Sequence, residues 1–442
     1  MDKESKLKAI EKNILDLVEE YTELKHQKLD FLPQISQVPI NGRVFDSNEV
    51  KELVKASLEF WLTDGEYSEK FSSKMSEFLN MKFVRIVNSG SSANLVAISA
   101  LTDSKIKNHF TEGDEVITSA VGFPTTVNPI FQNNLVPVFV DSVLGTYNPT
   151  ADMIIEGYTE KTKGIFLAHT LGNPFEVDKI KDFCEDKKLW LIEDNCDALG
   201  SKYNNVLTGT FGDISTLSFY PAHHITMGEG GAVITDSTKL KLSIDSFRDW
   251  GRDCWCKSGH DNTCNKRFDW QLGDLPKGYD HKFTYSNIGY NLKATDLQAS
   301  IGFAQMDKLP RFIKSRKENW KIINEYILQK PDYFLPHMPT ANSDPSWFGY
   351  AITVKDNQDF SRDDIVKFLN ENRIATRLMF GGNLIKQPAY KKKQFRVVGS
   401  AENADIVMNS SFWIGVYPGL SREMIDYMLE KIDEFINSRK VI

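Results

Sequence analysis

Hydrophobic and polar residues alternate along most of this chain with the two periods that distinguish helices from strands. Short apolar runs of the buried-strand type alternate with segments whose apolar residues recur every three to four positions. The predicted strands are 83–87, 115–118, 136–140, 164–168, 189–193, 214–219 and 231–235. One predicted helix follows the first strand and ends at residue 101, and the others are 125–133, 150–157 and 178–187. This alternation predicts an α/β domain with a mostly parallel sheet, whose ligand site lies at the carboxyl ends of the strands.

The remaining segments carry other patterns. Residues 5–25 place apolar side chains on one face at helical spacing, which predicts an amphipathic helix that docks on the body or on a partner subunit. Residues 32–43 form a Pro-interrupted extended arm, and the regular pattern lapses after 235. Segment 249–286 is rich in Gly, Asp, Asn, Trp and Cys, and it is too long for a plain connection. Further helices are expected at 47–61, 67–80, 295–306, 310–329, 362–370 and 421–438, and further strands at 348–354 and 375–378.

A chain of 442 residues is too long for one small core, so two domains are the default expectation. The patterns predict an N-terminal helix and arm over 1–45 and a large domain over 46–306 that contains the cysteine-rich loop 249–286. Residues 307–442 are predicted to form a smaller α+β domain.

Net charge, hydropathy and cysteine content argue against several classes of partner and cellular location. The net charge of −7 provides no dominant basic face, which argues against nucleic acid as a partner. The sequence shows no apolar core of a signal peptide and no apolar run as long as a membrane span, so a cytoplasmic protein is expected. Five cysteines in such a protein are better interpreted as thiols or metal ligands than as disulfides.

Polar and aromatic residues gather where the predicted strands end. The turn 88–94, Asn-Ser-Gly-Ser-Ser-Ala-Asn, precedes a helix, and a helix N-terminus after such a turn can bind an anion, although such turns are often only tight connections. Strand 189–193 delivers Glu193 and Asp194. A buried carboxylate there could keep a pyridine nitrogen protonated, or it could be a capping or ion-paired acid.

Residues 213–231 form the most informative stretch of the sequence. In enzymes that use pyridoxal phosphate, a strand, a turn and a glycine cluster arranged in this way carry the lysine that forms a Schiff base with the cofactor. This turn instead carries His223 and His224, and no lysine occurs between Lys202 and Lys239. The titration range of His223 suits proton transfer, and the alternative is a hydrogen-bonded core histidine.

Three cysteines lie close together in the irregular segment. Cys254, Cys256 and Cys264 fall within eleven residues, and Cys196 lies two residues after Asp194. This grouping predicts metal or cluster binding, but the spacing leaves the metal open because zinc and iron–sulfur clusters both take four thiolates. Cys184, within a predicted helix, is interpreted as a small buried hydrophobe.

Several of these motifs resemble one family. Segments 88–91, 193–194, 218–231 and 289–299 are similar to the nucleotide-sugar aminotransferases of the DegT/DnrJ/EryC1/StrS group. The resemblance implies the aspartate aminotransferase fold (fold type I of the pyridoxal phosphate enzymes), with a mixed, mostly parallel seven-stranded sheet and a smaller α+β C-terminal domain. One branch of that family has histidine in place of the lysine, and its signature resembles 248–256 and 261–264.

The resemblance also implies roles for individual residues. It implies that pyridoxamine phosphate binds non-covalently and that His223 is the catalytic base. Asp194 would pair with the pyridine nitrogen, and Phe123 would stack on the ring. The remaining implied cofactor contacts are Gly90, Ser91 and Ser218 at the phosphate, Asn291 from the other subunit of a homodimer, and Asp197 and His169 near the ring. The implied ligands of a [2Fe–2S] cluster are Cys196, Cys254, Cys256 and Cys264.

The activity implied by that branch is removal of the 3-hydroxyl of CDP-4-keto-6-deoxy-D-glucose, in the biosynthesis of 3,6-dideoxyhexoses of O-antigen. A separate NAD(P)H-dependent flavin and iron–sulfur reductase would supply the electrons. The alternatives are a nucleotide-sugar aminotransferase, a cluster-free 3-dehydratase acting on another nucleotide-linked 4-keto-6-deoxyhexose, and a non-enzymatic metal-binding paralogue. No segment indicates the nucleotide base, and Arg252 and Arg377 could contact a diphosphate or be surface or ion-pairing arginines.

Overall fold

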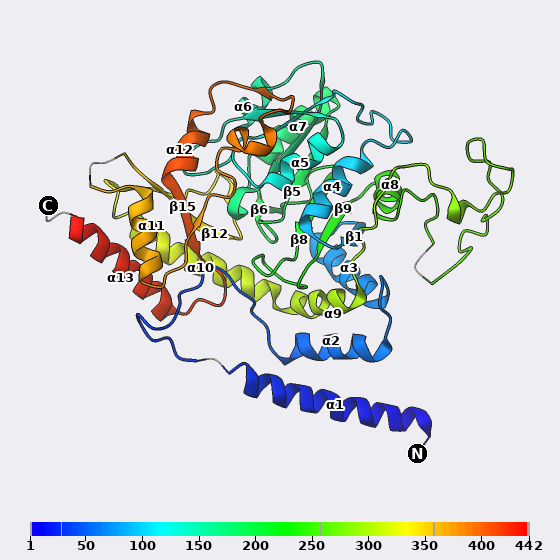
Figure 1. Cartoon of the computed structure of the whole chain (residues 1–442), viewed down its shortest axis with the longest axis horizontal. Helices are drawn as coiled ribbons and strands as arrows, with labels where there is room; N and C mark the ends of the chain where they lie inside the picture. Colours follow the sequence, from blue (N-terminus) through cyan, green and yellow to red (C-terminus); the bar gives the residue numbers. More distant parts are fainter. Residues whose placement is uncertain (1, 28, 257–258, 357–358, 440–442) are drawn as a thin grey trace.

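The computed structural model describes residues 2–27, 29–256, 259–356 and 359–439, and it is organised around an eight-stranded sheet (Figure 1). The strands run in the order β1-β9-β8-β5-β4-β2-β3-β14, with parallel pairing from β8 to β14 and antiparallel pairing of β9 with both neighbours. Their bounds are β1 (Phe83–Val87), β2 (Glu115–Ser119), β3 (Val136–Val140), β4 (Thr162–Ala168), β5 (Trp190–Asp194), β8 (Ile214–Ser218), β9 (Gly231–Thr235) and β14 (Arg396–Val397).

The α/β prediction and all seven predicted strands of this sheet are confirmed, and the strand count of seven is wrong by one. The eighth strand, β14, comes from the region assigned to the small domain and pairs in parallel with β3. Helices cover the sheet and fill two separate apolar clusters, one with α4, α5 and α8 and the other with α6 and α7. These helices are α4 (Gly90–Ala100), α5 (Pro124–Gln132), α6 (Ala151–Glu156), α7 (Val177–Lys187) and α8 (Thr238–Arg248).

Helix α8 corrects the expectation that regular structure lapses after 235. Ser237 caps it, and Leu240, Ile244 and Phe247 on one face enter the core beside α4. The loop 249–286, outside 257–258, projects from the body beyond α8, as the long green excursion in Figure 1 shows. A small three-stranded sheet lies apart from the main one and consists of β6 (Lys202–Tyr203), β7 (Val206–Leu207) and β11 (Ser343–Asp344).

The C-terminal part has its own antiparallel sheet, in the order β10-β12-β15-β13, and its own apolar cluster. Its α+β character is as predicted, although β10, β15 and α12 were not expected, and the boundary at 306/307 stays a prediction. Its strands are β10 (Phe334–Pro336), β12 (Gly349–Val354), β13 (Arg377–Leu378) and β15 (Ser411–Gly415), and its helices are α10 (Leu309–Ile327), α11 (Arg362–Glu371), α12 (Glu402–Ser410) and α13 (Arg422–Arg439).

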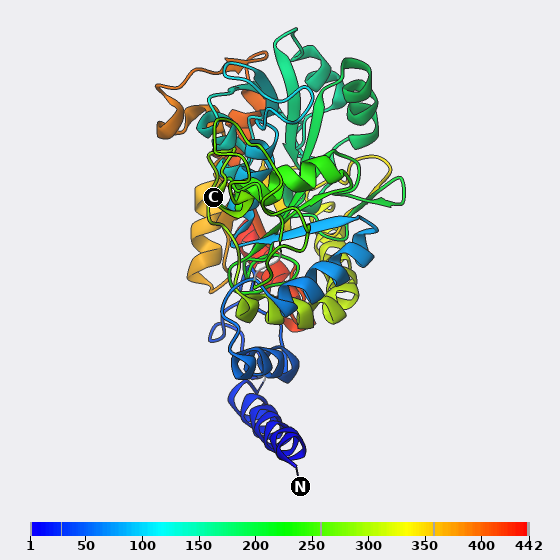
Figure 2. The same ribbon diagram turned by 90° about the vertical axis from the view of Figure 1, so that its right-hand side faces the viewer.

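The N-terminal helices lie outside the sheet, and two of them contact a later helix. Helix α9 (Asp296–Gln305) contacts both α2 (Ser47–Glu59) and α3 (Glu66–Leu79), and the predicted N-terminal helix forms as α1 (Lys3–Lys25). Both views place α1 at the outer edge of the molecule, next to α2 (Figures 1 and 2). None of the described helices combines the length and the apolar character that a membrane span requires.

Candidate active site

A cavity of about 680 Å³ lies at the carboxyl ends of β4, β5 and β8. It brings together most of the predicted site residues: Gly90, Ser91, Phe123, Asp194, Cys196, Asp197, Ser218 and His223. The opposite wall comes from the small domain through Phe348, Arg377, Leu378, Phe380 and Trp413, with Asn41 from the arm. The convergence follows from the topology, because the carboxyl ends of neighbouring parallel strands meet at one edge of a sheet.

One end of the cavity is suited to a phosphate group. Ser89 caps α4, and its hydroxyl accepts a hydrogen bond from the Ser92 amide at 3.0 Å. The first amides of a helix have no intrahelical acceptor and lie at the positive end of its dipole. A Cβ atom at Gly90 would lie 2.5 Å from the Ser218 Cβ, so glycine is what allows the helix start and the end of β8 to approach. The amide cradle and the Ser218 hydroxyl fit an anion.

The Asp194 carboxylate is held rigidly at the end of β5. Its Oδ2 accepts hydrogen bonds from Asn94 Nδ2 at 2.8 Å and Thr126 Oγ1 at 2.7 Å, and its Oδ1 accepts one from the Cys196 amide at 3.2 Å. Asn94 is oriented in turn by Thr216, whose hydroxyl donates to its Oδ1 at 2.6 Å. None of the ion pairs among the described residues involves Asp194. The carboxylate is therefore available to a protonated ring nitrogen in the cavity, and these residues fit a pyridoxal or pyridoxamine phosphate.

The neighbouring acid, Glu193, points into the core. Successive side chains of a strand face opposite sides, so Glu193 and Asp194 cannot both reach the cavity. Its Oε2 lies 3.0 Å from His169 Nε2 and accepts a hydrogen bond from the Gly209 amide at 2.8 Å. Its Oε1 accepts hydrogen bonds from the Phe211 and Gly212 amides at 2.8 and 2.7 Å. Burial raises the pKa of Glu193, but the hydrogen bond and charge of His169, with the amides, outweigh it and hold that pKa below its usual range.

His169 consequently departs from the expectation that it lies near the cofactor ring. Its imidazole is fully buried, stacks on Phe175 with the ring centres 4.3 Å apart, and pairs with Glu193. The cavity wall includes Ala168 and Thr170, on either side of it, and His169 itself is absent from that wall. Its position in the strand-end layer was predicted correctly, and its role there is to tie β4 to β5.

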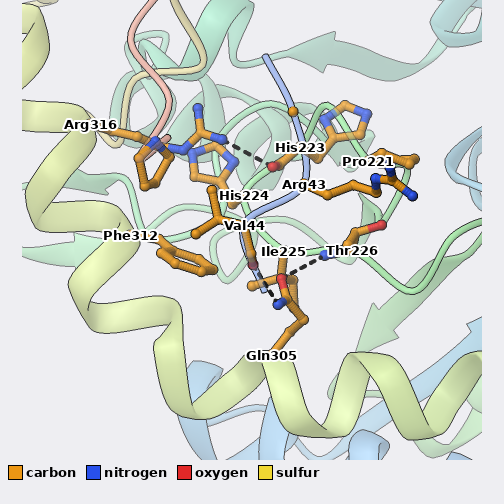
Figure 3. Close-up of a pocket in the computed structure, with 12 residues that line it drawn as sticks. Arg43, Val44, Pro221, His223, His224, Ile225, Thr226, Gln305, Phe312 and Arg316 are labelled. Atoms are coloured by element: carbon orange, nitrogen blue, oxygen red, sulfur yellow. Dashed lines mark hydrogen bonds between the residues drawn. The ribbon is translucent and has the colours of Figure 1, made fainter. Parts of the chain in front are cut away.

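The two histidines of the turn have different surroundings (Figure 3). His223 lines the cavity, its Nδ1 lies 3.4 Å from the Asp197 carboxylate, and its ring packs on Phe348 with centres 5.1 Å apart. The separation from Asp197 is too long for a good hydrogen bond. His224 is buried, and its Nε2 lies 2.8 Å from the Ser346 carbonyl oxygen. Burial and then the charge of Arg316 lower the pKa of His224 well below its ordinary value, so it is a neutral core histidine.

Arg316 is a neighbour of the turn that the sequence did not indicate. It is almost fully buried on α10, and its Nη2 donates to the His223 carbonyl at 3.0 Å (Figure 3). Its Nη1 donates to the carbonyls of Trp347 at 3.1 Å and Phe348 at 3.3 Å. No carboxylate lies within ion-pair distance of Arg316 in the described part of the chain. Burial, partly opposed by the charge of Asp197, lowers the pKa of its guanidinium to about 9.

The four predicted cluster ligands are not assembled in the described chain. Cys196 is in the cavity wall, whereas Cys254, Cys256 and Cys264 lie in the projecting loop. The loop thiols have polar neighbours of their own: the Thr263 hydroxyl donates to Cys256 Sγ at 3.1 Å, and Cys264 Sγ lies 3.4 Å from a nitrogen of His281. Among the residues that the structure places, no three His, Cys, Asp or Glu side chains form a group able to hold a metal. In the described chain the four thiols therefore lie at two separate places, one in the cavity wall and three in the loop.

Two further residues lie outside the cavity wall. Asn291 is exposed, and its side-chain oxygen accepts a hydrogen bond from Lys293 Nζ at 2.8 Å. Its contact with the cofactor of a second subunit stays a prediction. Arg252 lies in the loop with its guanidinium 4.7 Å from the ring centre of Trp250. Of the two arginines considered for a diphosphate, only Arg377 lines the cavity.

Comparison with known proteins places this fold and cavity in a family. The family model of the DegT/DnrJ/EryC1/StrS aminotransferases matches residues 44–433. The chain belongs to this family. It is 50% identical over 427 residues to the lipopolysaccharide biosynthesis protein RfbH of Salmonella typhimurium, covering 96% of this chain and 98% of that one. It is 52% identical over 397 residues to a dTDP-4-dehydro-2,6-dideoxy-D-glucose 3-dehydratase of Saccharopolyspora spinosa, covering 90% and 86%.

A solved structure supports the same placement within the DegT family. The E. coli GDP-4-keto-6-deoxy-D-mannose-3-dehydratase with bound hydrated PLP superposes with a TM-score of 0.79 at 30% identity, covering 90% of this chain and 99% of that one. The fold prediction, a fold of the pyridoxal phosphate type with a mostly parallel central sheet, is therefore confirmed.

Proposed function

We propose that this protein removes the 3-hydroxyl group of a nucleotide-linked 4-keto-6-deoxy sugar with pyridoxamine phosphate held non-covalently in the 680 Å³ cavity. One observation carries the proposal: none of the described residues lining the cavity is a lysine, and His223 lies where the strand, turn and glycine cluster would present one. The chain is an enzyme of the sugar 3-dehydratase kind, since relatives with that activity match almost its whole length.

Different residues of the cavity are proposed to bind the cofactor and to transfer the proton. When bound, the cofactor supplies an amine that condenses with a ketone and a conjugated ring that accepts an electron pair. Asp194 would hold the proton on the ring nitrogen, and the α4 amides and Ser218 would hold the phosphate. Phe123 would stack on the cofactor ring, and its own ring meets Phe380 edge-on with centres 6.3 Å apart.

His223 is the base of this proposal. Its Nδ1 faces the Asp197 carboxylate, which leaves Nε2 free to remove a proton within the cavity. Nε2 then holds the proton until it is passed to the departing hydroxyl oxygen, which leaves as water. Phe348 on one side and the Arg316 hydrogen bond to the His223 carbonyl hold the ring in place.

The finer proposals concern substrate and partners. We propose CDP-4-keto-6-deoxy-D-glucose as substrate; the similarity to the Salmonella lipopolysaccharide biosynthesis protein supports a sugar that is destined for lipopolysaccharide and does not indicate the nucleotide. Other relatives are named for dTDP and GDP sugars, so the CDP, dTDP and GDP forms of the sugar should be compared as substrates. A homodimer in which Asn291 completes the partner's site, and an NAD(P)H-dependent reductase, complete the proposal.

The [2Fe–2S] cluster is a separate proposal with its own test. It is supported by the number of free thiols and by three of them sharing one loop. In the described chain Cys196 lies apart from the three thiols of the loop, and the proton transfer proposed for His223 does not involve the cluster. Iron and sulfide analysis of anaerobically purified protein should find two of each per chain if the cluster binds. Zinc, or no metal, would reject it.

The experiment that tests the dehydratase proposal exchanges the histidine. With pyridoxamine phosphate and the nucleotide sugar, His223→Asn should lose 3-hydroxyl removal, measured by nuclear magnetic resonance of the sugar. His224→Asn is the matched control, because that ring contacts Ser346 and not the cavity, and it should retain the activity. Covalent attachment of the cofactor to the wild-type chain, measured by mass spectrometry after borohydride reduction, would refute the proposal. So would transfer of the amine to the sugar as the main product.

A further inference from the structure

Helix α1 carries an apolar face that the rest of the described chain leaves uncovered. Its positions follow the a and d spacing of successive heptads, the pattern of helices that pair with other helices. They are Leu7, Ile10, Ile14, Leu17, Tyr21 and Leu24. Five of the six are between 45% and 68% exposed, and Ile14 is half-buried. A row of exposed large apolar side chains on one helix marks an interaction surface.

A different face of α1 already holds the helix on the body. Thr22 is buried, Leu15 and Val18 are half-buried, and Glu19 forms an ion pair with Lys51 of α2 at 2.6 Å. Residues one position apart diverge by about 100° around a helix, so Thr22 and Tyr21 cannot face the same neighbour. Figures 1 and 2 show α1 at the molecular edge with α2 on one side of it. The heptad face is therefore additional to the packing on α2.

We infer that the heptad face of α1 packs antiparallel against the same face of α1 from a second copy of this chain. Charge along the helix specifies the orientation. The first half of the helix is basic, with four lysines and two glutamates, and the second half is acidic, with four acids and one lysine. The four lysines are Lys3, Lys6, Lys8 and Lys12, and the four acids are Asp16, Glu19, Glu20 and Glu23. An antiparallel pair places basic halves on acidic halves, whereas a parallel pair places like charges together.

Antiparallel pairing also satisfies the geometry of the heptad. In this orientation each a position meets a d position of the other helix, so Leu7 meets Leu24 and Ile14 meets Leu17. The interface is two-fold symmetric, as expected of a surface that binds its own copy. The family match begins at residue 44, so α1 lies outside the matched segment. The inference therefore does not depend on the proposed reaction.

Cross-linking in the full-length protein tests the pairing and its direction. Oxidation of a mixture of Leu7→Cys and Leu24→Cys chains should give a linked pair on a non-reducing gel, above the background of the five native cysteines in the unmodified chain. Leu7→Cys alone should give only that background, because antiparallel helices keep the two copies of residue 7 at opposite ends. A strong link in Leu7→Cys alone would overturn the antiparallel arrangement.

A charge placed in the interface gives the second readout. Adding Leu17→Glu to both chains of the mixture should reduce the linked fraction at least about tenfold, because an unpaired carboxylate is costly to bury. Ala9→Glu is the matched control, since it adds the same charge on an exposed face of the same helix. Circular dichroism checks that both variants remain folded. An unchanged linked fraction with Leu17→Glu, or no link in the original mixture, means that something other than α1 covers this face and overturns the inference.

Discussion

Arg316 offers a sharp test of how a buried charge without a carboxylate partner is tolerated beside the histidine turn. Replacing it with methionine removes three hydrogen bonds, to the carbonyls of His223, Trp347 and Phe348. Hydrogen bonds that involve a charged group contribute about 1.5–3 kcal/mol each, so the three contribute roughly 5–9 kcal/mol. The same change removes the cost of burying the guanidinium.

That cost follows from the pKa of the guanidinium, which burial lowers from 12.5 to about 9. At about 1.36 kcal/mol per pKa unit, it amounts to roughly 5 kcal/mol. The difference predicts that Arg316→Met lowers the free energy of unfolding by no more than about 4 kcal/mol. Arg316→Lys keeps the buried charge but cannot reproduce the planar fork that reaches three carbonyls. We therefore expect the lysine variant to be destabilised at least as much as the methionine variant.

Urea unfolding followed by tryptophan fluorescence at pH 7 and pH 9 measures both effects. Burial lowers the pKa of a lysine in the folded state, so the unfolded state binds more protons and the stability of Arg316→Lys should rise with pH over this interval. Arg316→Met has no such group at this position and should not show that added slope. The reasoning is refuted if Arg316→Lys matches the wild type in stability, or if its stability does not rise between the two pH values.

Two further predictions concern the cofactor cradle and a buried histidine. Gly90→Ala should weaken pyridoxamine phosphate binding about 5- to 150-fold, because overpacking against Ser218 costs about 1–3 kcal/mol. Gly42→Ala, whose Cβ would make ordinary contacts of 3.4 Å with Tyr417 outside the cavity lining, should bind normally in the same equilibrium dialysis. Equal losses would contradict this account. Burial lowers the pKa of His337 to about 3, so its contribution to stability should be complete above pH 6.5 and lost as the pH falls toward 3. The His337→Gln variant should show a shallower acid loss in thermal unfolding, and an unchanged slope would disprove it.

The sequence predicted the large domain well because its strands are short, apolar and separated by helices of ordinary length. The misses have physical reasons. Strand β14 has two residues and forms only because it reaches the edge of a sheet assembled from distant segments. Strand β15 is buried along its whole length, so its residues show no alternation to distinguish them from other buried segments. Helix α8 differs from these two strands, because its apolar face at helical spacing is a signal that the sequence does carry.

The sequence predicted those parts of the site that follow from the order of strands and helices. Strand ends converge in a parallel sheet, so Gly90, Asp194 and Ser218 were brought together as expected. Which of two adjacent histidines faces the cavity depends on the path of an irregular turn, and no periodicity encodes it. Arg316 lies 93 positions from the carbonyl that it holds, and its contribution appears only in the folded chain. Cys254, Cys256 and Cys264 share one loop, whereas Cys196 follows β5 in the cavity wall.

The pairing of β14, from the C-terminal part of the chain, with β3 of the large sheet limits how the small domain can move. It is joined to the large domain first through the continuous run from α9 to α10, and again where β14 pairs with β3 and Arg396 holds both carboxylate oxygens of Glu115 at 2.7 and 3.0 Å. A body attached at two separated points cannot swing open about a single hinge without breaking sheet hydrogen bonds. We therefore expect substrate to enter past side chains and short segments at the rim of the cavity, with the β14–β3 pairing left intact.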